Sequence, residues 1–219
     1  MKSCARLHDN LASAPRGAHL YPDGPVVPAQ MDDAFRRRLD VRPEQIVLQP
    51  VIEADRFLLR PLRRSDAGLI ALYTADRALA EGTRAIPHPL PPGATEDFIA
   101  AALSDKRGED VWVLDGSAHD EAEVLGLVSL RPIDRDQSEV GYWVAPAFWN
   151  AGLASEAVAA IVAANPHCAR TLFAEVFQDN PGSARVLSNC GFDYLGDAEA
   201  WSVARNASVP TWTYLRKML

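Results

Sequence analysis

The nine residues from Trp149 to Ala157, WNAGLASEA, place small side chains where a strand-like segment turns into a helical one. Gly152, Ala154 and Ser155 leave the backbone of this turn accessible. Backbone N–H groups and the positive end of a helix dipole favour an anion there, and small side chains let a phosphate approach. Tight packing alone explains the same small residues, so other motifs must decide between the two interpretations.

A second polar motif, DNPGSARVLSNCGF, follows the next strand-like segment and brings Asn180 and Ser183 to its carboxyl end. An Asn before Pro is a common helix N-cap, and a serine in the first helical turn is equally ordinary. The alternative is that both residues face a ligand lying between two diverging strands, whose unpaired backbone groups need partners. A ligand with amide groups of its own would fill such a gap like an extra strand.

Several classes of protein are disfavoured. The chain has neither a G-x-G-x-x-G fingerprint nor a Walker lysine, which argues against a nicotinamide or nucleoside-triphosphate enzyme. Three cysteines and five scattered histidines show no metal spacing, so we expect no metal site and a reducing compartment. A net charge of −7 argues against nucleic acid as a partner, and no apolar run suggests a membrane span. Without a signal peptide, the expected location is cytoplasmic.

The hydrophobic pattern predicts the elements that position these motifs. The expected strands are 57–61, 111–115, 122–132, 138–146, 170–178, 191–204 and 209–219, and the expected helices are 67–79, 95–103, 152–164 and 181–190. Strands between 111 and 146 form an antiparallel meander, whereas the strand–helix–strand unit from 140 to 177 is a parallel crossover. The expected fold class is therefore α/β (α+β), a mixed, mostly antiparallel central sheet with flanking helices. Ligands in such crossovers bind near the helix N-terminus, where WNAGLA lies.

The N-terminal residues 1–45 differ from the rest because they are rich in turns and broken by proline. One segment, 29–40, has the charge pattern of a short helix. We predict an irregular extension over 1–45 and a single domain over 46–219. The extension either packs on the domain or a partner subunit, or is a disordered tail.

Three segments in this order, ADRFLLRPL, EVGYWVAPAFWNAGLASEAV and DNPGSARVLSNCGF, resemble the GNAT superfamily of N-acetyltransferases. The resemblance covers about residues 56–219 and is strongest to the Rim-type branch, which modifies ribosomal-protein N-termini. It implies acetyl-CoA as co-substrate in a strand–helix–strand core. The implied contacts are Trp149, Asn150, Ala151, Gly152, Leu153, Ala154 and Ser155 for the pyrophosphate, and Trp143, Val144, Ala145, Asn180 and Ser183 for the pantetheine and thiol end. Asn150 stands where glycine is usual and Ala151 where a basic residue or Gln is usual, which removes a side-chain phosphate contact.

Acetyl transfer from a thioester to an amine needs a neutral amine, a polarised carbonyl, a stabilised thiolate and aligned reactants. We expect the N–H of Val144 or its neighbour to polarise the carbonyl. Glu139 is the first candidate for the base, directly or through water, and Glu175 is the second; an exposed strand glutamate is the competing interpretation of Glu139. Many members of the superfamily stabilise the leaving thiolate with a tyrosine, but Leu187 stands at that position here. In the Rim-type branch a serine takes this role, and the resemblance implies that Ser183 is that serine.

The acceptor pocket is expected between the proline-rich loop 82–93 and the final hairpin. Its expected residues are Thr83, Arg84, His88, Trp201 and Arg205. The resemblance implies an N-acetyltransferase that acts on a primary amine, either a protein N-terminus or a small molecule, without a metal. The alternative is an acyl-CoA-binding module or sensor without turnover, which the departures at Ala151 and Leu187 would suit. A homodimer is common in the resembled branch, and the sequence leaves the oligomeric state of this chain open.

Overall fold

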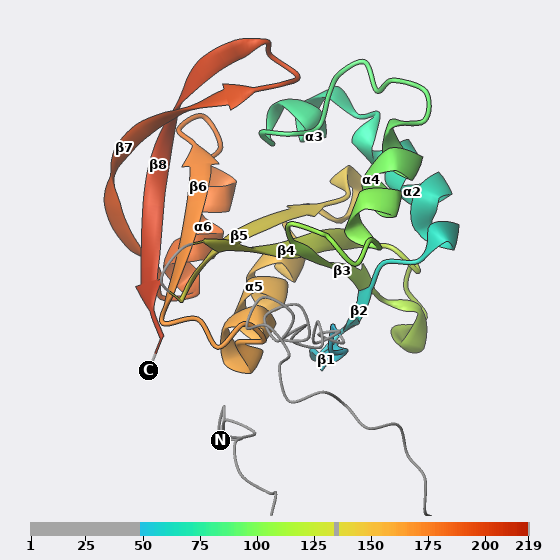
Figure 1. Ribbon diagram of the computed structural model, residues 1–219, viewed down its shortest axis with the longest axis horizontal. Helices are drawn as coiled ribbons and strands as arrows, with labels where there is room; N and C mark the ends of the chain where they lie inside the picture. Colours follow the sequence, from blue (N-terminus) through green and yellow to red (C-terminus); the bar gives the residue numbers. More distant parts are fainter. Residues whose placement is uncertain (1–48, 134–135, 219) are drawn as a thin grey trace, which may run out of the picture. The chain divides into compact units, whose positions relative to one another are not determined.

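One mixed sheet carries the other elements. The computed structural model describes residues 49–133 and 136–218. Its strands are β1 (Ile52–Glu53), β2 (Leu58–Pro61), β3 (Asp110–Asp115), β4 (Gly126–Ile133), β5 (Gln137–Val144), β6 (Thr171–Phe177), β7 (Asp193–Ser202) and β8 (Ala207–Lys217). They form a single sheet in the order β1-β2-β3-β4-β5-β6-β8-β7 (Figure 1). All neighbours are antiparallel except β5 and β6, so the predicted mixed, mostly antiparallel sheet is confirmed.

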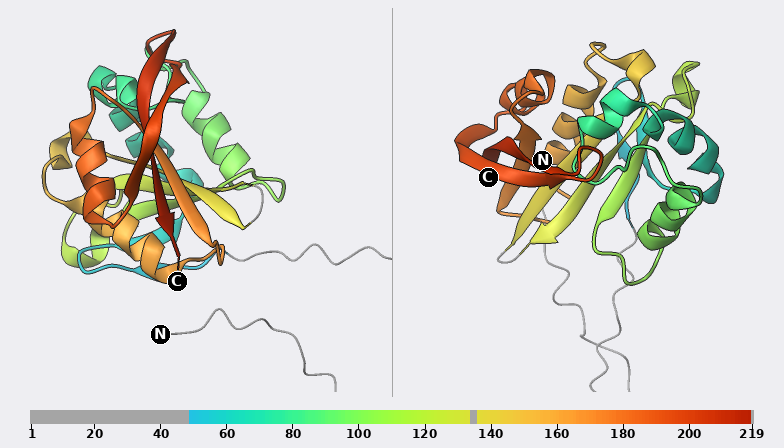
Figure 2. Two further views of the ribbon diagram at one scale, coloured as in Figure 1. Left: turned by 90° about the vertical axis from the view of Figure 1, so that its left-hand side faces the viewer. Right: turned by 90° about the horizontal axis from the view of Figure 1, so that it is seen from above.

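Helices cover both faces of this sheet (Figure 2). They are α2 (Ala67–Thr74), α3 (Arg77–Glu81), α4 (Ala94–Ala102), α5 (Leu153–Ala164) and α6 (Pro181–Asn189), with short 3-10 turns at Arg64–Asp66, Ser117–His119 and Pro146–Phe148. Trp112 and Leu114 belong to the core under α5 and α6, whereas Val111 and Val113 belong to the core under α2 and α4. Because successive strand residues point to opposite faces, a strand buried on both sides is apolar without alternation. Within the described residues, no helix has the length and apolarity that a membrane crossing requires.

The predicted helix at 67–79 is wrong in one respect, because the structure divides it into α2 and α3. Asp76 adopts an extended conformation with ψ 127°, and its side chain accepts a hydrogen bond of 2.9 Å from the Leu79 N–H. An aspartate that satisfies the first N–H groups of a new helix competes with continuation of the old one. The predicted extension at 1–45 and its helix at 29–40 lie outside the described residues and stay predictions.

Strands β5 and β6 are paired only at their beginnings and then diverge. The three pairs are Gln137 with Thr171, Ser138 with Leu172 and Glu139 with Phe173. Strand β5 continues to Val144, while β6 stays paired with β8 from Thr171 to Phe177 and follows the final hairpin away from β5 (Figure 1). The predicted parallel crossover through α5 is confirmed, and the divergence leaves strand edges in need of partners.

A buried arginine fastens the start of α2 to the sheet. Arg60 is 4% exposed, and its guanidinium donates two hydrogen bonds of 2.9 Å to Asp66 and one of 2.5 Å to Asp115. Burial by itself would raise the pKa of Asp115, but hydrogen bonds from Ser117 and Arg60 outweigh it and lower that pKa. The cluster holds together because each charge is paired.

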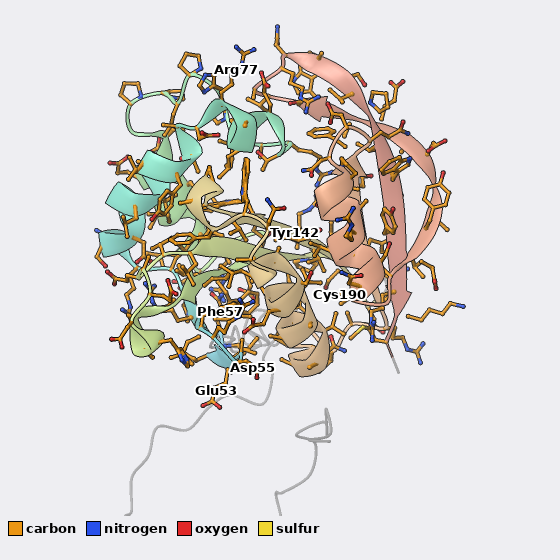
Figure 3. All side chains as sticks on the ribbon, turned by 180° about the vertical axis from the view of Figure 1, so that it is seen from behind. Glu53, Asp55, Phe57, Arg77, Tyr142 and Cys190 are labelled. Atoms are coloured by element: carbon orange, nitrogen blue, oxygen red, sulfur yellow. The ribbon has the colours of Figure 1, made fainter. Side chains whose placement is uncertain are left out.

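Replacing Asp66 with asparagine is expected to lower the free energy of unfolding by about 3 kcal/mol, because it leaves the buried Arg60 charge with too little compensation. The matched control is Glu81→Gln, which removes a carboxylate from the ion pair with Arg77. Arg77 is 73% exposed at the periphery of the molecule (Figure 3). This control should cost less than about 0.5 kcal/mol. Urea unfolding at neutral pH measures both values, and equal losses would contradict the distinction.

Candidate active site

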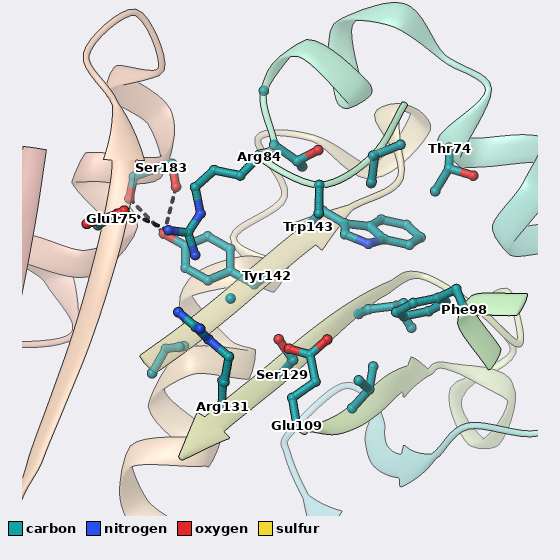
Figure 4. A pocket seen from close by; sticks show the side chains of 18 of the residues that line it. Thr74, Arg84, Phe98, Glu109, Ser129, Arg131, Tyr142, Trp143, Glu175 and Ser183 are labelled. Carbon is teal, nitrogen blue, oxygen red and sulfur yellow. Dashed lines mark hydrogen bonds and ion pairs between the residues drawn. The ribbon is translucent and has the colours of Figure 1, made fainter. Parts of the chain in front are cut away.

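Two cavities meet at the opening between β5 and β6. The first, of about 340 Å³, lies under loop 82–93 on the α2 and α4 face; we call it the sheet cavity (Figure 4). The second, of about 670 Å³, lies between α3 and the N-termini of α5 and α6; we call it the loop cavity. The residues that line both are Gly82, Thr83, Tyr142, Trp143 and Ser183. A group held in one cavity can therefore reach a group held in the other.

The turn between β5 and α5 presents a row of backbone donors to the loop cavity. Asn150 and Gly152 have positive φ values of 62° and 80°, a conformation that glycine adopts freely and asparagine tolerates better than most residues. Asn150, which stands where glycine is usual in the resembled family, therefore still adopts the backbone conformation that the turn requires. None of the N–H groups of residues 150–155 has a hydrogen-bond partner among the described residues. Unpartnered N–H groups at a helix start suit an anion.

Arg56, 95 residues before Ala151 in the sequence, holds this turn in place. The Arg56 side chain donates to the Ala151 carbonyl at 2.9 Å and to the Glu156 carboxylate at 2.6 Å. The Arg56 N–H also donates to Glu156, at 2.8 Å. Sequence analysis missed this contact, because a link across 95 to 100 residues leaves no local pattern.

The free edge of β5 offers donors to a strand-like ligand. The Ala145 N–H donates to the Leu125 carbonyl beside β4 at 2.9 Å. Because the backbone groups of an antiparallel strand alternate, the N–H groups of Val144 and Tyr142 point the other way, toward the opening. The Trp149 indole already donates to the Val144 carbonyl at 2.7 Å, which leaves the Val144 N–H as the free group.

The first turn of α6 brings a hydroxyl pair to the junction of the cavities. Asn180 caps the helix, with its side-chain oxygen accepting from the Ser183 N–H at 3.2 Å. The Ser183 hydroxyl lies 2.8 Å from the Tyr142 hydroxyl, which also donates to the Ser183 carbonyl at 2.9 Å. Sequence analysis gave Tyr142 no role, because its partner lies 41 residues away. Leu187 is fully buried in the core.

Charges of alternating sign line the sheet cavity, and Figure 4 labels four of them, Glu109, Arg131, Arg84 and Glu175. In order they are Glu109, Arg131, Glu139, Arg84 and Glu175. Arg84 donates to Glu175 at 2.7 Å and to one oxygen of Glu139, while Arg131 donates to the other oxygen of Glu139. This bond with Glu139 raises the pKa of Arg131. Glu139 is 8% exposed, and guanidinium groups engage both of its oxygens.

Arg205 bridges two elements beside the opening. Arg205, at the tip of the final hairpin, donates to the Glu81 carbonyl at 2.7 and 2.9 Å and to Asp179 at 2.5 Å. Its guanidinium also lies 5.0 Å from the centroid of the Phe177 ring. The hydrogen bond with Asp179 raises the pKa of Arg205. Arg205 thus joins α3 to the loop that leads into α6.

The structure gathers most, but not all, of the residues predicted for the site. The predicted cofactor contacts that line the loop cavity are Trp143, Val144, Trp149, Asn150, Gly152, Leu153, Ala154, Ser155, Asn180 and Ser183. Ala145 is fully buried, and Ala151 contributes its carbonyl to Arg56 instead. Arg84 lines the sheet cavity, whereas His88 and Trp201 line neither cavity. The described residues contain no cluster of His, Cys, Asp and Glu that could hold a metal ion.

Comparison with known proteins agrees with this geometry. Residues 56–193 match the family model described as the acetyltransferase (GNAT) domain. The uncharacterized N-acetyltransferase YoaA of Bacillus subtilis (strain 168) is 28% identical over 156 residues, which are 67% of this chain and 85% of that relative.

Solved structures share the fold at low sequence identity. The ribosomal L7/L12 alpha-N-protein acetyltransferase RimL, in complex with coenzyme A, has a TM-score of 0.66 and 16% identity over 77% of this chain and 98% of that chain. The spermidine N-acetyltransferase of Vibrio cholerae, in complex with CoA and spermine, has a TM-score of 0.60 and 19% identity over 73% and 95%. Ribosomal-protein and polyamine enzymes thus appear side by side, and the expected Rim-type branch is not singled out.

The family match spans more than half of the chain and includes the donor turn, the diverging strands and the hydroxyl pair. The chain therefore belongs to the acetyltransferase (GNAT) domain family, as an acetyl-CoA-dependent N-acyltransferase.

Proposed function

We propose that this protein transfers the acetyl group of acetyl-CoA directly to a primary amine, carried by a protein N-terminus or by a small molecule. The observation that carries the proposal is the junction of the two cavities at Tyr142, Trp143 and Ser183. A module that only bound acyl-CoA would need the loop cavity alone. The charged sheet cavity on the other side of the junction supports turnover.

The loop cavity fits the co-substrate on the basis of its unpartnered donors. The N–H groups of residues 150–155 would hold the pyrophosphate, and the free edge of β5 at Val144 would pair with the amide-bearing pantetheine. Asn180 keeps its amide nitrogen available beside this edge, since its oxygen caps α6. When bound, acetyl-CoA supplies the activated thioester. The Val144 N–H then polarises the carbonyl, and the Ser183 hydroxyl lies at the thiol end.

The sheet cavity suits an amine. Its three glutamates outnumber its two arginines, and this excess of negative charge attracts a protonated amine before it is deprotonated for attack. Trp143 and Phe98 provide apolar wall for the body of the acceptor (Figure 4). We assign the base to Glu139, acting directly or through water once Arg84 gives way. A Rim-type protein N-terminus and a small amine both satisfy this chemistry.

Substituting Gly152 with alanine tests the loop cavity. An alanine at a φ of +80° is strained by about 1–2 kcal/mol, so the turn should shift and acetyl-CoA affinity should fall about tenfold. The matched control is Gly68→Ala in α2, where an added Cβ meets nothing within 4 Å and φ is not positive. Calorimetric titration with acetyl-CoA measures both variants. Equal affinity in Gly152→Ala and wild type would argue against cofactor binding at this turn.

Glu139→Gln and Glu175→Gln distinguish the two candidate bases. With Glu139 as the base, Glu139→Gln should lower kcat/KM about a hundredfold, while acetyl-CoA affinity is kept. Glu175→Gln should lower kcat/KM by less than about tenfold, and the exposed Glu53→Gln on β1 serves as the control.

The assay follows release of free thiol with a panel of amines and N-terminal peptides, and thermal unfolding confirms that each variant is folded. A loss of about a hundredfold in Glu175→Gln but not in Glu139→Gln would transfer the role to Glu175. Acetyl-CoA binding without turnover on the whole panel would favour the binding module.

A further inference from the structure

The hydroxyls of Tyr142 and Ser183 face each other at the junction of the cavities (Figure 4). Thr83 also lines both cavities, but its hydroxyl donates to the Ala80 carbonyl at 3.0 Å. Tyr142 is the only tyrosine that lines either cavity among the described residues. Leu187, one turn after Ser183 on the same helix, is fully buried and offers no donor. Among the residues that line both cavities, this pair therefore offers the hydroxyls that can turn toward the thiol end.

The phenol has one proton and two acceptors within reach. When it donates to the Ser183 carbonyl, the Ser183 hydroxyl is free to donate back to the phenol oxygen. When it donates to the Ser183 Oγ instead, the serine proton is released for a third partner. A negative charge beside Ser183 favours the second arrangement, because both hydroxyl dipoles then point toward that charge.

We propose that Tyr142 is a positioning residue, which donates to the Ser183 Oγ and thereby directs the Ser183 hydroxyl at the departing thiolate of CoA. This inference rests on the proposed function, which places the thiol at Ser183. In the step itself the N–C bond forms and the C–S bond breaks, with the electron pair left on sulfur. The amine proton passes to the base. Sulfur receives a hydrogen bond from Ser183, and Tyr142 keeps its own proton.

The surroundings of Tyr142 agree with a donor that does not ionise. Its side chain lies between β5 and the helices α5 and α6, near Cys190 (Figure 3). Burial raises the pKa of the Tyr142 phenol, and the hydrogen bond with Ser183 opposes this only in part. A proton relay that left a phenolate would be costly there, whereas a rotated hydrogen bond is not.

The test needs no acceptor. Each protein is saturated with CoA or with desulfo-CoA, which lacks the thiol, and thiolate absorbance is taken as the difference between the two complexes across pH. Subtraction removes the protein's own tyrosines and cysteines. The proteins compared are wild type, Tyr142→Phe, Ser183→Ala, the double variant and the control Tyr194→Phe, whose hydroxyl is exposed on β7 and bonded to Asp197.

We expect wild type to lower the pKa of the bound CoA thiol by about one pH unit, because hydrogen bonds stabilise its charged form. Ser183→Ala should abolish this shift and Tyr142→Phe should remove most of it. The double variant should match Ser183→Ala, since Tyr142 acts through Ser183. Tyr194→Phe should behave as wild type, and desulfo-CoA affinity should be equal in all five proteins.

An unchanged thiol pKa in Tyr142→Phe would overturn the inference, as would additive effects in the double variant. CoA and desulfo-CoA failing to bind wild type would instead overturn the proposed function, and this inference with it. If Tyr142→Phe does not fold, replacing all tyrosines with 3-fluorotyrosine strengthens the phenol donor without changing its shape. The pKa of the bound CoA thiol should then fall further in the protein that keeps Ser183 but not in Ser183→Ala. An equal fall in both proteins would overturn the inference.

Discussion

The divergence of β5 from β6 after Glu139 is the constraint on which the site depends. Paired strands would satisfy their own backbone groups and close the sheet, leaving no donors for a ligand. Strand β6 instead follows β8, with which it is paired along its whole length, and β5 follows β4. Each strand therefore has one committed edge and one open edge. The two cavities meet where these open edges face each other.

Long-range arginine contacts hold the opening in shape. Arg56 fastens the donor turn from one side, and Arg205 joins α3 to the approach to α6 from the other. Arg84 spans the diverging strands themselves by binding Glu139 on β5 and Glu175 on β6. A planar guanidinium with several donors suits such bridges, because it can satisfy two partners on different elements at once.

The same pairing places a restriction on the chemistry. Both oxygens of Glu139 are engaged by Arg84 and Arg131, so the carboxylate is held in one orientation. Under the proposed function, an arriving ammonium would compete with Arg84 for the same carboxylates. Acceptor binding and the position of loop 82–93 would therefore be coupled through one side chain under that function, and the loop would influence the proposed base.

How much the sequence alone determined differs between the parts of the site. The donor turn was predictable, since small residues and a helix start are local features, and the crossover from residue 140 to residue 177 followed from the order of periodic segments. The break at Asp76 was missed, because an aspartate inside an apolar period reads as helix surface until its N-cap geometry is seen.

Contacts between distant segments could not be read in this way. No local sequence feature identifies Tyr142 as the partner of Ser183. Likewise, no local feature shows that Trp201 is exposed on a strand and does not line the pocket. Sequence periodicity reports which face of an element is buried, but not which side chains of other elements meet that face. The sequence by itself determined the donor turn, the antiparallel meander and the parallel crossover. Only the tertiary structure decided which hydroxyls and charges meet, because strand divergence and long arginine side chains bring them together.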